Sequence, residues 1–549
     1  MKKGMSPTRE DRIEIMDTTL RDGEQTCGVS FLPHEKISAA KMLLEVLHVN
    51  RVEVASARVS DGEFECVKRV CDWARETDNL CHIEVLGFVD DGKSIDWIRR
   101  AGGKIINLLC KGSEKHCRYQ LGKTPHEHWE DIRRNVLMAY DAGLHVNLYL
   151  EDWSNGIKDN PDYVIGMVEY LSDLAQSEGE THDAEDMRQE CPAQGPLILR
   201  FMLPDTLGIL NPSETSHYVG LMTQTFPSFH FDFHAHNDYD LAVSNAFAAV
   251  EAGAKGLHTT INGLGERAGN APLASIQAVL KDHLGCETDI DEEKLGSVSR
   301  IIESYSGIAI PPNRPIVGEN VFTQVAGVHA DGDNKNNLYC NNLLPERFGR
   351  KREYALGKTS GKANIRRNLD ELGLELDDDA MRRVTDRIIE LGDKKEVVTQ
   401  EDLPYIIADV LKHSVEEEKV TLIGYNVALS KGLKPTCALK IDISGQTYEE
   451  NSSGDGQYDA FVRALRKIYK ETLKRRFPML INYAVSIPPG GRTDAFVQTI
   501  ITWEHEGHVF KTRGFDADQT EAAIKATMKM LNILENSTSP VTTGNNNDN

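Results

Sequence analysis

The feature that most constrains the fold is a regular alternation of strand-like and helix-like segments along the first half of the chain. Eight short segments rich in apolar and β-branched residues are separated by helical patterns such as those at residues 33–49 and 238–252. The predicted strands span residues 13–20, 51–56, 83–89, 104–110, 145–152, 197–206, 228–237 and 256–265. Eight such units within about 280 residues favour a closed barrel of parallel strands over an open sheet. The sequence therefore predicts an α/β protein with a (β/α)8 TIM barrel at residues 1–281.

The remainder of the 549-residue chain is long enough for further domains. Residues 282–415 are predicted to form a mostly helical linker region. Residues 441–465 align without a gap with residues 503–527, so that Gly445 matches Gly507 and Ala460 matches Ala522. This internal repeat predicts a C-terminal α+β domain of two strand-strand-helix units at residues 419–535. The Ser/Thr/Asn-rich residues 537–549 are predicted to be a disordered tail.

Composition and charge exclude several classes of protein. The 62 Lys and Arg against 85 Asp and Glu give a net charge of −23, which argues against a nucleic-acid partner. No apolar run reaches the length of a membrane-spanning helix, and the N-terminal residues 1–12 lack the apolar stretch of a secretory signal. The ten scattered cysteines form no C-x-x-C pair. We therefore expect a cytoplasmic protein with reduced thiols and no membrane partner, and we interpret the acidic stretch at about 177–196 as a surface insertion.

The ends of three predicted strands carry the residues that suggest chemistry. In barrels of this kind, functional residues lie at the C-terminal ends of the strands. His234 and His236 are two residues apart on one strand, so both imidazoles point to the same face. Asp22 ends the first strand and Asn270 follows the eighth, next to the seventh and first strands in a closed barrel. Two imidazoles, a carboxylate and an amide oxygen suit Mn²⁺, Zn²⁺ or Mg²⁺, whereas a histidine pair alone is equally explained by hydrogen bonding.

Three long motifs then reveal a family resemblance. T-T-L-R-D-G-E-Q at residues 18–25, H-A-H-N-D at 234–238 and N-G-L-G-E-R-A-G-N at 262–270 together resemble the DRE-TIM metallolyase superfamily. The most similar branch is that of the acyltransferases that condense acetyl-CoA with a 2-oxo acid, namely the isopropylmalate, homocitrate and citramalate synthases. The repeat domain resembles the leucine- or isoleucine-sensing domain of these enzymes, and the resemblance covers nearly the whole chain.

The resemblance implies a role for each of several residues. The implied metal ligands are Asp22, His234, His236 and, as a looser or alternate ligand, Asn270. The implied catalytic residues are Arg21, Glu151, His329 and Tyr339, with His329 contributed by the neighbouring protomer of a domain-swapped homodimer. Thr206 and Asp331 are implied to help bind the substrate. Without the resemblance, Thr206 would be interpreted as a helix N-cap, Glu151 as part of an ion pair and His329 as a surface histidine.

The choice of 2-oxo acid depends on the pocket walls. Leu86, Leu109 and Tyr149 end the third, fourth and fifth predicted strands, and the strings around them resemble citramalate synthases most closely. Two leucines and a tyrosine leave space for the methyl group of pyruvate and crowd an isopropyl group. Such discrimination amounts to only about 1–3 kcal/mol per methylene. The sequence thus predicts condensation of acetyl-CoA with pyruvate to (R)-citramalate, on the route to isoleucine, and leaves 2-isopropylmalate synthesis from 3-methyl-2-oxobutanoate, on the route to leucine, as the alternative.

Two other functions fit the sequence less well. A carbon–carbon lyase of the hydroxymethylglutaryl-CoA type would carry a cysteine in the glycine-rich loop at residues 262–270, and this loop has none. An amino-acid sensor built on an inactive barrel would not need Arg21, Asp22 and the two histidines.

Two further segments are candidates for ligand binding. The strand-to-helix turns at 454–456 and 514–516 are predicted to receive the carboxylate of a branched-chain amino-acid effector, unless the domain serves dimerisation alone. The basic run at residues 347–352 either meets the phosphates of coenzyme A or pairs with nearby acids.

Overall fold

The computed structural model describes residues 12–175, 196–334, 338–393, 398, 400, 403–411, 419–486, 497–516 and 518–537. The chain divides into two compact units, of which the first comprises Met1–Thr323 with Cys340–Glu353 and the second comprises Gln324–Tyr339 with Tyr354–Asn549. The predicted insertion at 177–196 and the predicted tail at 537–549 lie outside the described residues, apart from one residue each. The predicted domain boundaries remain a proposal.

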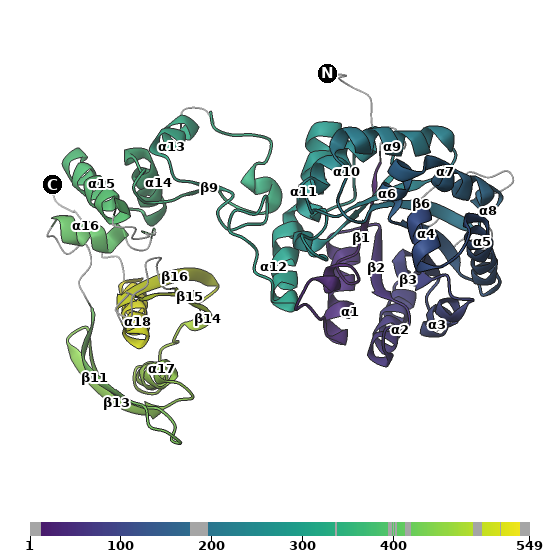
Figure 1. The fold of residues 1–549 in the computed structure, drawn as a ribbon. Coiled ribbons are helices and arrows are strands. Elements are labelled where there is room, and N and C mark those ends of the chain that lie inside the picture. The colour runs from purple at the N-terminus through teal and green to yellow at the C-terminus, as the bar shows by residue number, and fades with distance from the viewer. Residues whose placement is uncertain are drawn as a thin grey trace. The chain divides into compact units, whose positions relative to one another are not determined.

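The first unit is built on a closed barrel of eight parallel strands, as predicted (Figure 1). Strand β1 pairs with both β2 and β8, and the register of Ile15 with Leu257 closes the barrel. The strands are β1 (Glu14–Asp17), β2 (Arg51–Ser56), β3 (Ile83–Phe88), β4 (Ile105–Lys111), β5 (His145–Glu151), β6 (Ile198–Asp205), β7 (Phe231–Ala235) and β8 (Gly256–Thr259). Strand β1 is shorter than predicted because the Thr18 carbonyl accepts the backbone N–H groups of residues 21, 22 and 23 and turns the chain.

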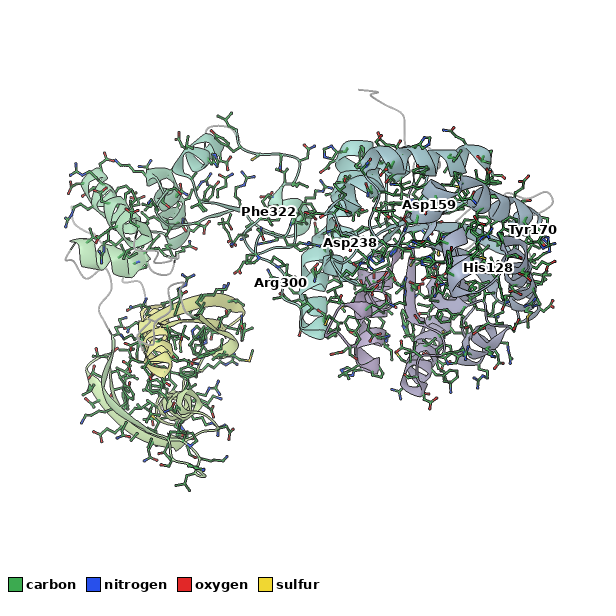
Figure 2. All side chains as sticks on the ribbon, in the orientation of Figure 1. His128, Asp159, Tyr170, Asp238, Arg300 and Phe322 are labelled. Carbon is green, nitrogen blue, oxygen red and sulfur yellow. The ribbon has the colours of Figure 1, made fainter. Side chains whose placement is uncertain are left out.

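Helices surround the barrel and begin at recognisable capping sequences. Thr124 and Glu127 form a capping box at the start of α5, and Asn211 and Glu214 form another at the start of α9. The helices of this unit are α1 (Pro33–Lys41), α2 (Asp61–Glu76), α3 (Lys93–Ala101), α4 (Glu114–Gln120), α5 (Pro125–Asp141), α6 (Trp153–Asp159), α7 (Pro161–Tyr170), α8 (Ser172–Ala175), α9 (Pro212–Thr225), α10 (Ala242–Glu251), α11 (Leu273–Val279) and α12 (Leu295–Ser306). Figure 2 shows their side chains, including His128 on α5 and Tyr170 on α7.

The barrel strands alternate between an apolar outer face and a partly polar inner face. In β2, Val52 and Val54 belong to the large apolar core of this unit. Arg51 and Glu53 alternate with these valines and are buried. Arg51 forms ion pairs with Glu84 and Asp232 of other strands, and Glu53 forms one with Arg21 in the turn after β1. A separate small apolar cluster is formed by residues of five strands, namely Met16, Leu86, Tyr149 and Met202 with Leu109 packed against it. Strand periodicity therefore places both charged and apolar side chains inside the barrel.

The second unit begins with a helical region, as predicted. Its core contains Ile365, Leu369, Val384, Ile388 and Leu403. The helices are α13 (Gly327–Asn334), α14 (Lys362–Leu372), α15 (Asp378–Asp393) and α16 (Leu403–Leu411). Two short strands, β9 (Thr323–Gln324) and β10 (Glu353–Tyr354), lie where the chain passes between the two units.

The C-terminal part contains the predicted repeat, and each repeated unit has one more strand than the sequence suggested. The first unit is β11 (Val420–Ala428), β12 (Thr436–Ile443), β13 (Gln446–Ser453) and α17 (Gln457–Lys467), and the second is β14 (Met479–Ser486), β15 (Val497–His505), β16 (His508–Asp516) and α18 (Gln519–Ser537). Both three-stranded sheets are antiparallel. Strand β11 was missed because most of its side chains are exposed, so it lacks the alternation of a half-buried strand.

The hairpins of the two repeated units have the same backbone geometry. Ser444 and Gly445 have φ of 53° and 83°, and Glu506 and Gly507 have φ of 52° and 85°. Two consecutive residues with positive φ are typical of the tight type I′ turn, for which glycine at the second position is favourable. Helices α17 and α18 contribute Phe461, Leu465 and Leu531 to one apolar core. The matched glycines in the sequence thus mark equivalent turns of two units that share a core.

The cysteines differ in one respect from the expectation of reduced thiols. Eight described cysteines are free. Cys81 is disulfide-bonded, so the expectation is wrong at this position. Among the described residues, no helix has the combination of length and apolar character needed to cross a bilayer.

Candidate metal centre

Three side chains meet at the C-terminal ends of the barrel strands. Asp22 lies in the turn after β1, His234 lies in β7, and His236 follows the last residue of that strand. Asp22 Oδ2 is 3.3 Å from His234 Nε2 and 3.8 Å from His236 Nε2. One potential ligand atom from each residue lies within 4.8 Å of the others, and all three residues are buried. The structure thus brings together the two imidazoles and the carboxylate that the sequence analysis placed at a metal.

The potential ligand atoms lack hydrogen-bond partners. Buried atoms without a partner include Asp22 Oδ1, both ring nitrogens of His234, and His236 Nδ1. Asn270 forms a backbone bridge with His236, and its side-chain Nδ2 donates to the Leu264 carbonyl at 3.1 Å. Asn270 Oδ1 is left buried and unpartnered. Because unpaired buried polar atoms are costly, this arrangement fits a divalent cation bound by nitrogen and oxygen ligands.

The charge states of the three residues suit metal binding. Burial opposes ionisation of Asp22, but Arg21 and His234 outweigh it and hold the pKa of this carboxyl well below its ordinary value. Burial lowers the pKa of His234, although Asp22 opposes the shift. Burial and the neighbouring His234 lower the pKa of His236 to about 4. A carboxylate and two neutral imidazoles are the forms that bind a metal ion.

The Arg21 guanidinium is bound by carboxylates on one side, and on the other side it has a nitrogen without a partner. Its Nε donates to Glu53 Oε2 at 2.6 Å, and its Nη1 lies 3.5 Å from Asp22 Oδ2. Its Nη2 is buried without a partner. Glu53 also accepts hydrogen bonds from Thr18 Oγ1 at 2.6 Å and Asn107 Nδ2 at 2.8 Å. The guanidinium is therefore fixed beside the candidate ligands, with donor capacity available for a bound oxyanion.

The predicted pocket walls lie together inside the barrel. Leu86 and Tyr149 are in the small apolar cluster, with Leu109 packed against it. The ring centroid of Tyr149 is 5.8 Å from that of His234 and 5.8 Å from Arg21 Cζ. The apolar walls therefore adjoin the candidate metal ligands.

Sequence reasoning missed two members of this cluster and the carboxylate that holds Arg21. Met16 and Met202 are fully buried with Leu86 and Tyr149. Their strands' alternation of inward and outward residues could have indicated both methionines, and the same alternation in β2 could have indicated Glu53. The sequence could not indicate which residues they would contact.

Glu151 and Thr206 both contact neighbouring protein groups. Glu151 forms an ion pair with Lys111 on the neighbouring strand β4. Thr206 Oγ1 accepts a hydrogen bond from the backbone N–H of Asp152 at 2.9 Å. The Thr206 carbonyl accepts one from Arg267 Nη2 at 2.8 Å, and Arg267 also pairs with Asp238, which is labelled in Figure 2. The ion pair of Glu151 agrees with the simpler of its two interpretations, and a role toward substrate remains a prediction.

His329, Asp331 and Tyr339 belong to the second compact unit. His329 and Asp331 lie in α13, and the ring centroids of His329 and Tyr339 are 4.3 Å apart. All three side chains are exposed. The structure therefore groups these residues with one another, and their role in catalysis remains a prediction.

The basic run at 347–352 pairs locally. Arg347 donates to Asp282 at 2.7 Å and to Glu292 at 2.6 Å. Arg350 donates to the Glu319 carbonyl at 2.8 Å and lies over the ring of Phe322. These contacts support pairing with nearby groups rather than binding of phosphates.

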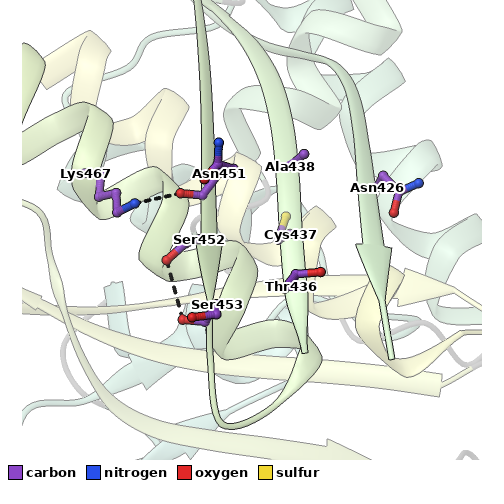
Figure 3. Close-up of a pocket in the computed structure, with 8 residues that line it drawn as sticks. All are labelled: Asn426, Thr436, Cys437, Ala438, Asn451, Ser452, Ser453 and Lys467. Atoms are coloured by element: carbon purple, nitrogen blue, oxygen red, sulfur yellow. Dashed lines mark hydrogen bonds between the residues drawn. The ribbon is translucent and has the colours of Figure 1, made fainter. Parts of the chain in front are cut away.

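The predicted effector turns differ from each other in structure. The turn at 454–456 connects β13 to α17, whereas residues 514–516 are the last residues of β16. A cavity of about 580 Å³ lies beside the first turn, lined by residues of β11, β12 and β13, most of them polar, and by Lys467 of α17 (Figure 3). Lys467 donates to the Asn451 carbonyl at 2.7 Å in this cavity. An effector site at these turns remains a prediction.

Three family models match successive parts of the chain. The HMGL-like model matches residues 12–302. The model described as a homocitrate synthase post-HMGL domain-like region matches residues 316–396. The model of the LeuA allosteric (dimerisation) domain matches residues 397–535. Together these matches account for the barrel, the helical region and the repeat domain in order.

Similar proteins match along nearly the whole chain. A protein named (R)-citramalate synthase from Methanocaldococcus jannaschii is 33% identical over 527 residues, which cover 95% of this chain and 100% of the relative. A probable 2-isopropylmalate synthase from Methanopyrus kandleri is also 33% identical, with 95% and 98% covered. A 2-isopropylmalate synthase from M. jannaschii is 32% identical, with 95% of each chain covered. Sequence identity is therefore nearly the same to the relative named citramalate synthase and to those named 2-isopropylmalate synthase, and it does not distinguish between them.

Proposed function

The chain belongs to the HMGL-like family, and we propose that it acts in the branch that condenses acetyl-CoA with a 2-oxo acid and releases coenzyme A. In this reaction the methyl carbon of the acetyl group loses a proton and bonds to the keto carbon of the 2-oxo acid. The keto oxygen takes up a proton, and water hydrolyses the thioester. The observation that carries the proposal is the buried group of Asp22, His234 and His236 beside Arg21.

Some of the barrel residues would bind the metal ion, and Arg21 would stabilise the charge that develops on the substrate. A divalent metal ion held by Asp22, His234 and His236 would polarise the keto group of the 2-oxo acid. Arg21, fixed by Glu53, would donate from its free Nη2 to the oxygen that gains negative charge. Because these groups are buried, each such interaction is stronger than it would be in water.

Pyruvate is the 2-oxo acid that the pocket supports best. The apolar cluster places Leu86, Leu109 and Tyr149 beside His234, and Met16 and Met202 complete it. Five large side chains leave room for a methyl group more readily than for an isopropyl group, so the proposed product is (R)-citramalate, on the route to isoleucine.

The test of this substrate is an assay of free coenzyme A with acetyl-CoA and a panel of 2-oxo acids. We expect the highest kcat/KM with pyruvate. A higher kcat/KM with 3-methyl-2-oxobutanoate would show that the protein is a 2-isopropylmalate synthase instead. If no 2-oxo acid caused release of coenzyme A, the proposed reaction would be wrong.

The proposed base that removes the methyl proton is His329, with Asp331 and Tyr339 beside it. Its support is the packing of the His329 and Tyr339 rings on an exposed surface of the second unit. We propose that this segment completes the active site of the neighbouring protomer in a homodimer with exchanged linkers.

The arrangement in trans can be tested by complementation. His329→Ala should lower kcat strongly while 2-oxo acid binding is retained. Mixed with an inactive Asp22→Ala chain, it should recover activity, because one site of a heterodimer is intact. Confirmed subunit exchange without recovery would place His329 and Asp22 in the same protomer's site.

The C-terminal domain is proposed to mediate dimerisation and feedback inhibition by a branched-chain amino acid. The match of residues 397–535 to the LeuA allosteric (dimerisation) domain supports this proposal. Inhibition requires the effector to bind the less active state more tightly, by a coupling of about 1–3 kcal/mol. Calorimetric titration of the full chain with isoleucine, leucine and valine should detect one ligand. If none of the three binds, only the dimerisation role is left.

A further inference from the structure

An ion pair between Lys111 and Glu151 lies one register step beyond the predicted pocket walls. In the register of β4 and β5, Leu109 pairs with Tyr149, and Lys111 pairs with Glu151. Side chains two residues apart on a strand point to the same face. Lys111 and Glu151 therefore follow the two wall residues on the inner face, one step closer to the C-terminal ends of the strands, where substrate enters.

The backbone around this ion pair is fixed by several contacts. The Lys111 N–H donates to His128 Nε2 at 3.0 Å, and the Lys111 carbonyl accepts from the Tyr163 hydroxyl at 2.9 Å. The Gly112 N–H donates to the Glu151 carbonyl at 2.6 Å. A Cβ atom at Gly112 would lie 2.5 Å from the Leu150 carbonyl oxygen, so no larger residue fits there. The two strand ends are thus held together at the ion pair.

The two charged groups are unequally exposed. The Lys111 side chain is 12% exposed and the Glu151 side chain 31% exposed. Removal of the ammonium would leave a carboxylate without its counter-ion beside a pocket that must admit an anion. A second carboxylate bound nearby would be repelled by this uncompensated charge, because like charges repel more strongly beside partly buried groups than in bulk water.

We propose that Lys111 is a positioning residue that holds the Glu151 carboxylate at the pocket mouth and offsets its charge when the carboxylate of the 2-oxo acid enters. This inference rests on the proposed function, because it requires an anionic substrate. Lys111 acts through Glu151, so its importance depends on the negative charge at that position.

The inference is tested with four variants of the metal-loaded full chain. Lys111→Met keeps the length of the side chain and removes its charge, Lys111→Arg keeps the charge, and Glu151→Gln is made alone and combined with Lys111→Met. In Lys111→Met, KM for the 2-oxo acid should rise about tenfold or more, while KM for acetyl-CoA changes less than about twofold. Lys111→Arg should restore KM for the 2-oxo acid to within about threefold of the wild-type value.

The decisive comparison is between the effect of Lys111→Met in the wild-type chain and its effect in the Glu151→Gln chain. Because Glu151 is an implied catalytic residue, this comparison uses the Kd for the 2-oxo acid, measured by calorimetric titration of each variant. In the Glu151→Gln chain, adding Lys111→Met should leave this Kd nearly unchanged, since no charge is left to offset. An equal increase in Kd in both backgrounds would overturn the inference and show that Lys111 acts independently of Glu151. Lys158→Met is the matched control, because Lys158 pairs with Glu214 at 2.7 Å on the outside of the barrel and should affect neither KM.

Two outcomes separate this inference from the proposed function. A wild-type protein that releases coenzyme A with a 2-oxo acid, together with an unchanged KM in Lys111→Met, overturns the inference alone. A wild-type protein inactive with every 2-oxo acid overturns both. Thermal unfolding of each variant shows whether a change in KM reflects loss of folded protein.

Discussion

Two layers inside the same barrel bury charged groups in different ways. Toward the N-terminal ends of the strands, Arg51 contacts Glu84 at 2.9 Å, Asp232 at 2.6 Å and Glu14 at 3.3 Å. Arg200 contacts Glu14 at 2.7 Å. Each carboxylate in this layer has a cationic partner.

At the C-terminal ends of the strands, several buried polar atoms lack a charged or hydrogen-bonding partner. Asp22 has Arg21 beside it, but Asp22 Oδ1, the ring nitrogens of His234 and Asn270 Oδ1 have no hydrogen-bond partner. Burial is similar in both layers.

Atoms without a hydrogen-bond partner also occur in the paired layer, at Arg51 Nε, Arg200 Nε and His258 Nδ1. The C-terminal layer differs because a carboxylate and two imidazoles bring ligand atoms within 4.8 Å of one another. The comparison teaches that neither buried charge nor an unpartnered atom identifies a binding site by itself, whereas converging ligand atoms do.

The largest expected effect follows from removing the unpartnered ligands. The double variant His234→Ala, His236→Ala should lose bound divalent metal and lower kcat/KM on the order of ten-thousandfold. Chelation of the wild-type protein should abolish activity, and Mn²⁺ or Mg²⁺ should restore it. Metal content measured by mass spectrometry and the coenzyme A release assay check both points.

A histidine of the paired layer is the control for this experiment. His230 lies 2.9 Å from Asp232 at the other end of the same strand region. His230→Gln should retain the full metal content. Undiminished turnover of the metal-free double variant would remove the metal site from the proposed reaction.

The second effect tests whether the paired layer stabilises the fold. Arg51→Met would leave Glu84, Asp232 and Glu14 buried with too little positive charge. The free energy of unfolding of the barrel should fall by about 3–5 kcal/mol, because one member of a buried ion network is missing. Urea unfolding followed by circular dichroism measures this change.

An exposed ion pair provides the contrast. Arg69→Met removes a pair with Glu65 in which both side chains are more than half exposed, and it should change the free energy of unfolding by less than about 0.5 kcal/mol. If Arg51→Met changed the free energy of unfolding as little as Arg69→Met, the ion network around Arg51 would contribute little to stability.

The third effect concerns Glu53, which connects the two layers through Asn107. Asn107 Nδ2 donates to Glu53 at 2.8 Å and to Glu84 at 3.0 Å. Glu53→Gln weakens the hold on Arg21, so kcat should fall by about 30-fold, equivalent to a charged hydrogen bond of roughly 2 kcal/mol. Metal content should be unchanged. Loss of metal together with activity would show that Glu53 supports the ligands rather than Arg21.

The last effect is a change in stability at Asp17 that depends on pH. Burial raises the pKa of Asp17 from 3.8 to about 7, against hydrogen bonds from Thr19. A carboxyl whose pKa is higher in the folded state makes folding less favourable as the pH rises from about 4 to 7. Asp17→Asn should therefore raise the free energy of unfolding at pH 8 by up to roughly 4 kcal/mol and have little effect near pH 4. Urea unfolding at both pH values would contradict this if the two shifts were equal.

The sequence was most informative where local periodicity decides the outcome. The second strand was predicted at 51–56 and is Arg51–Ser56, because charged and β-branched residues alternate over its first four positions. The first strand was predicted to reach residue 20 and ends at Asp17, because three backbone N–H groups converge on the Thr18 carbonyl. Strand β11 was missed because few of its side chains are buried. Local patterns therefore fail where a turn or an exposed edge replaces a half-buried strand.

The sequence by itself determined that His234 and His236 share one face of a strand, because successive side chains alternate. It also predicted that the candidate metal ligands lie at the C-terminal ends of a parallel barrel. Only the tertiary structure decided that Glu53 holds Arg21, that Met16 and Met202 join the pocket walls, and that Lys111 pairs with Glu151. These contacts join residues on different strands, and barrel closure and strand register set which of them meet. Local periodicity fixes which side of a strand a residue faces, and it contains no information about the neighbour across the barrel.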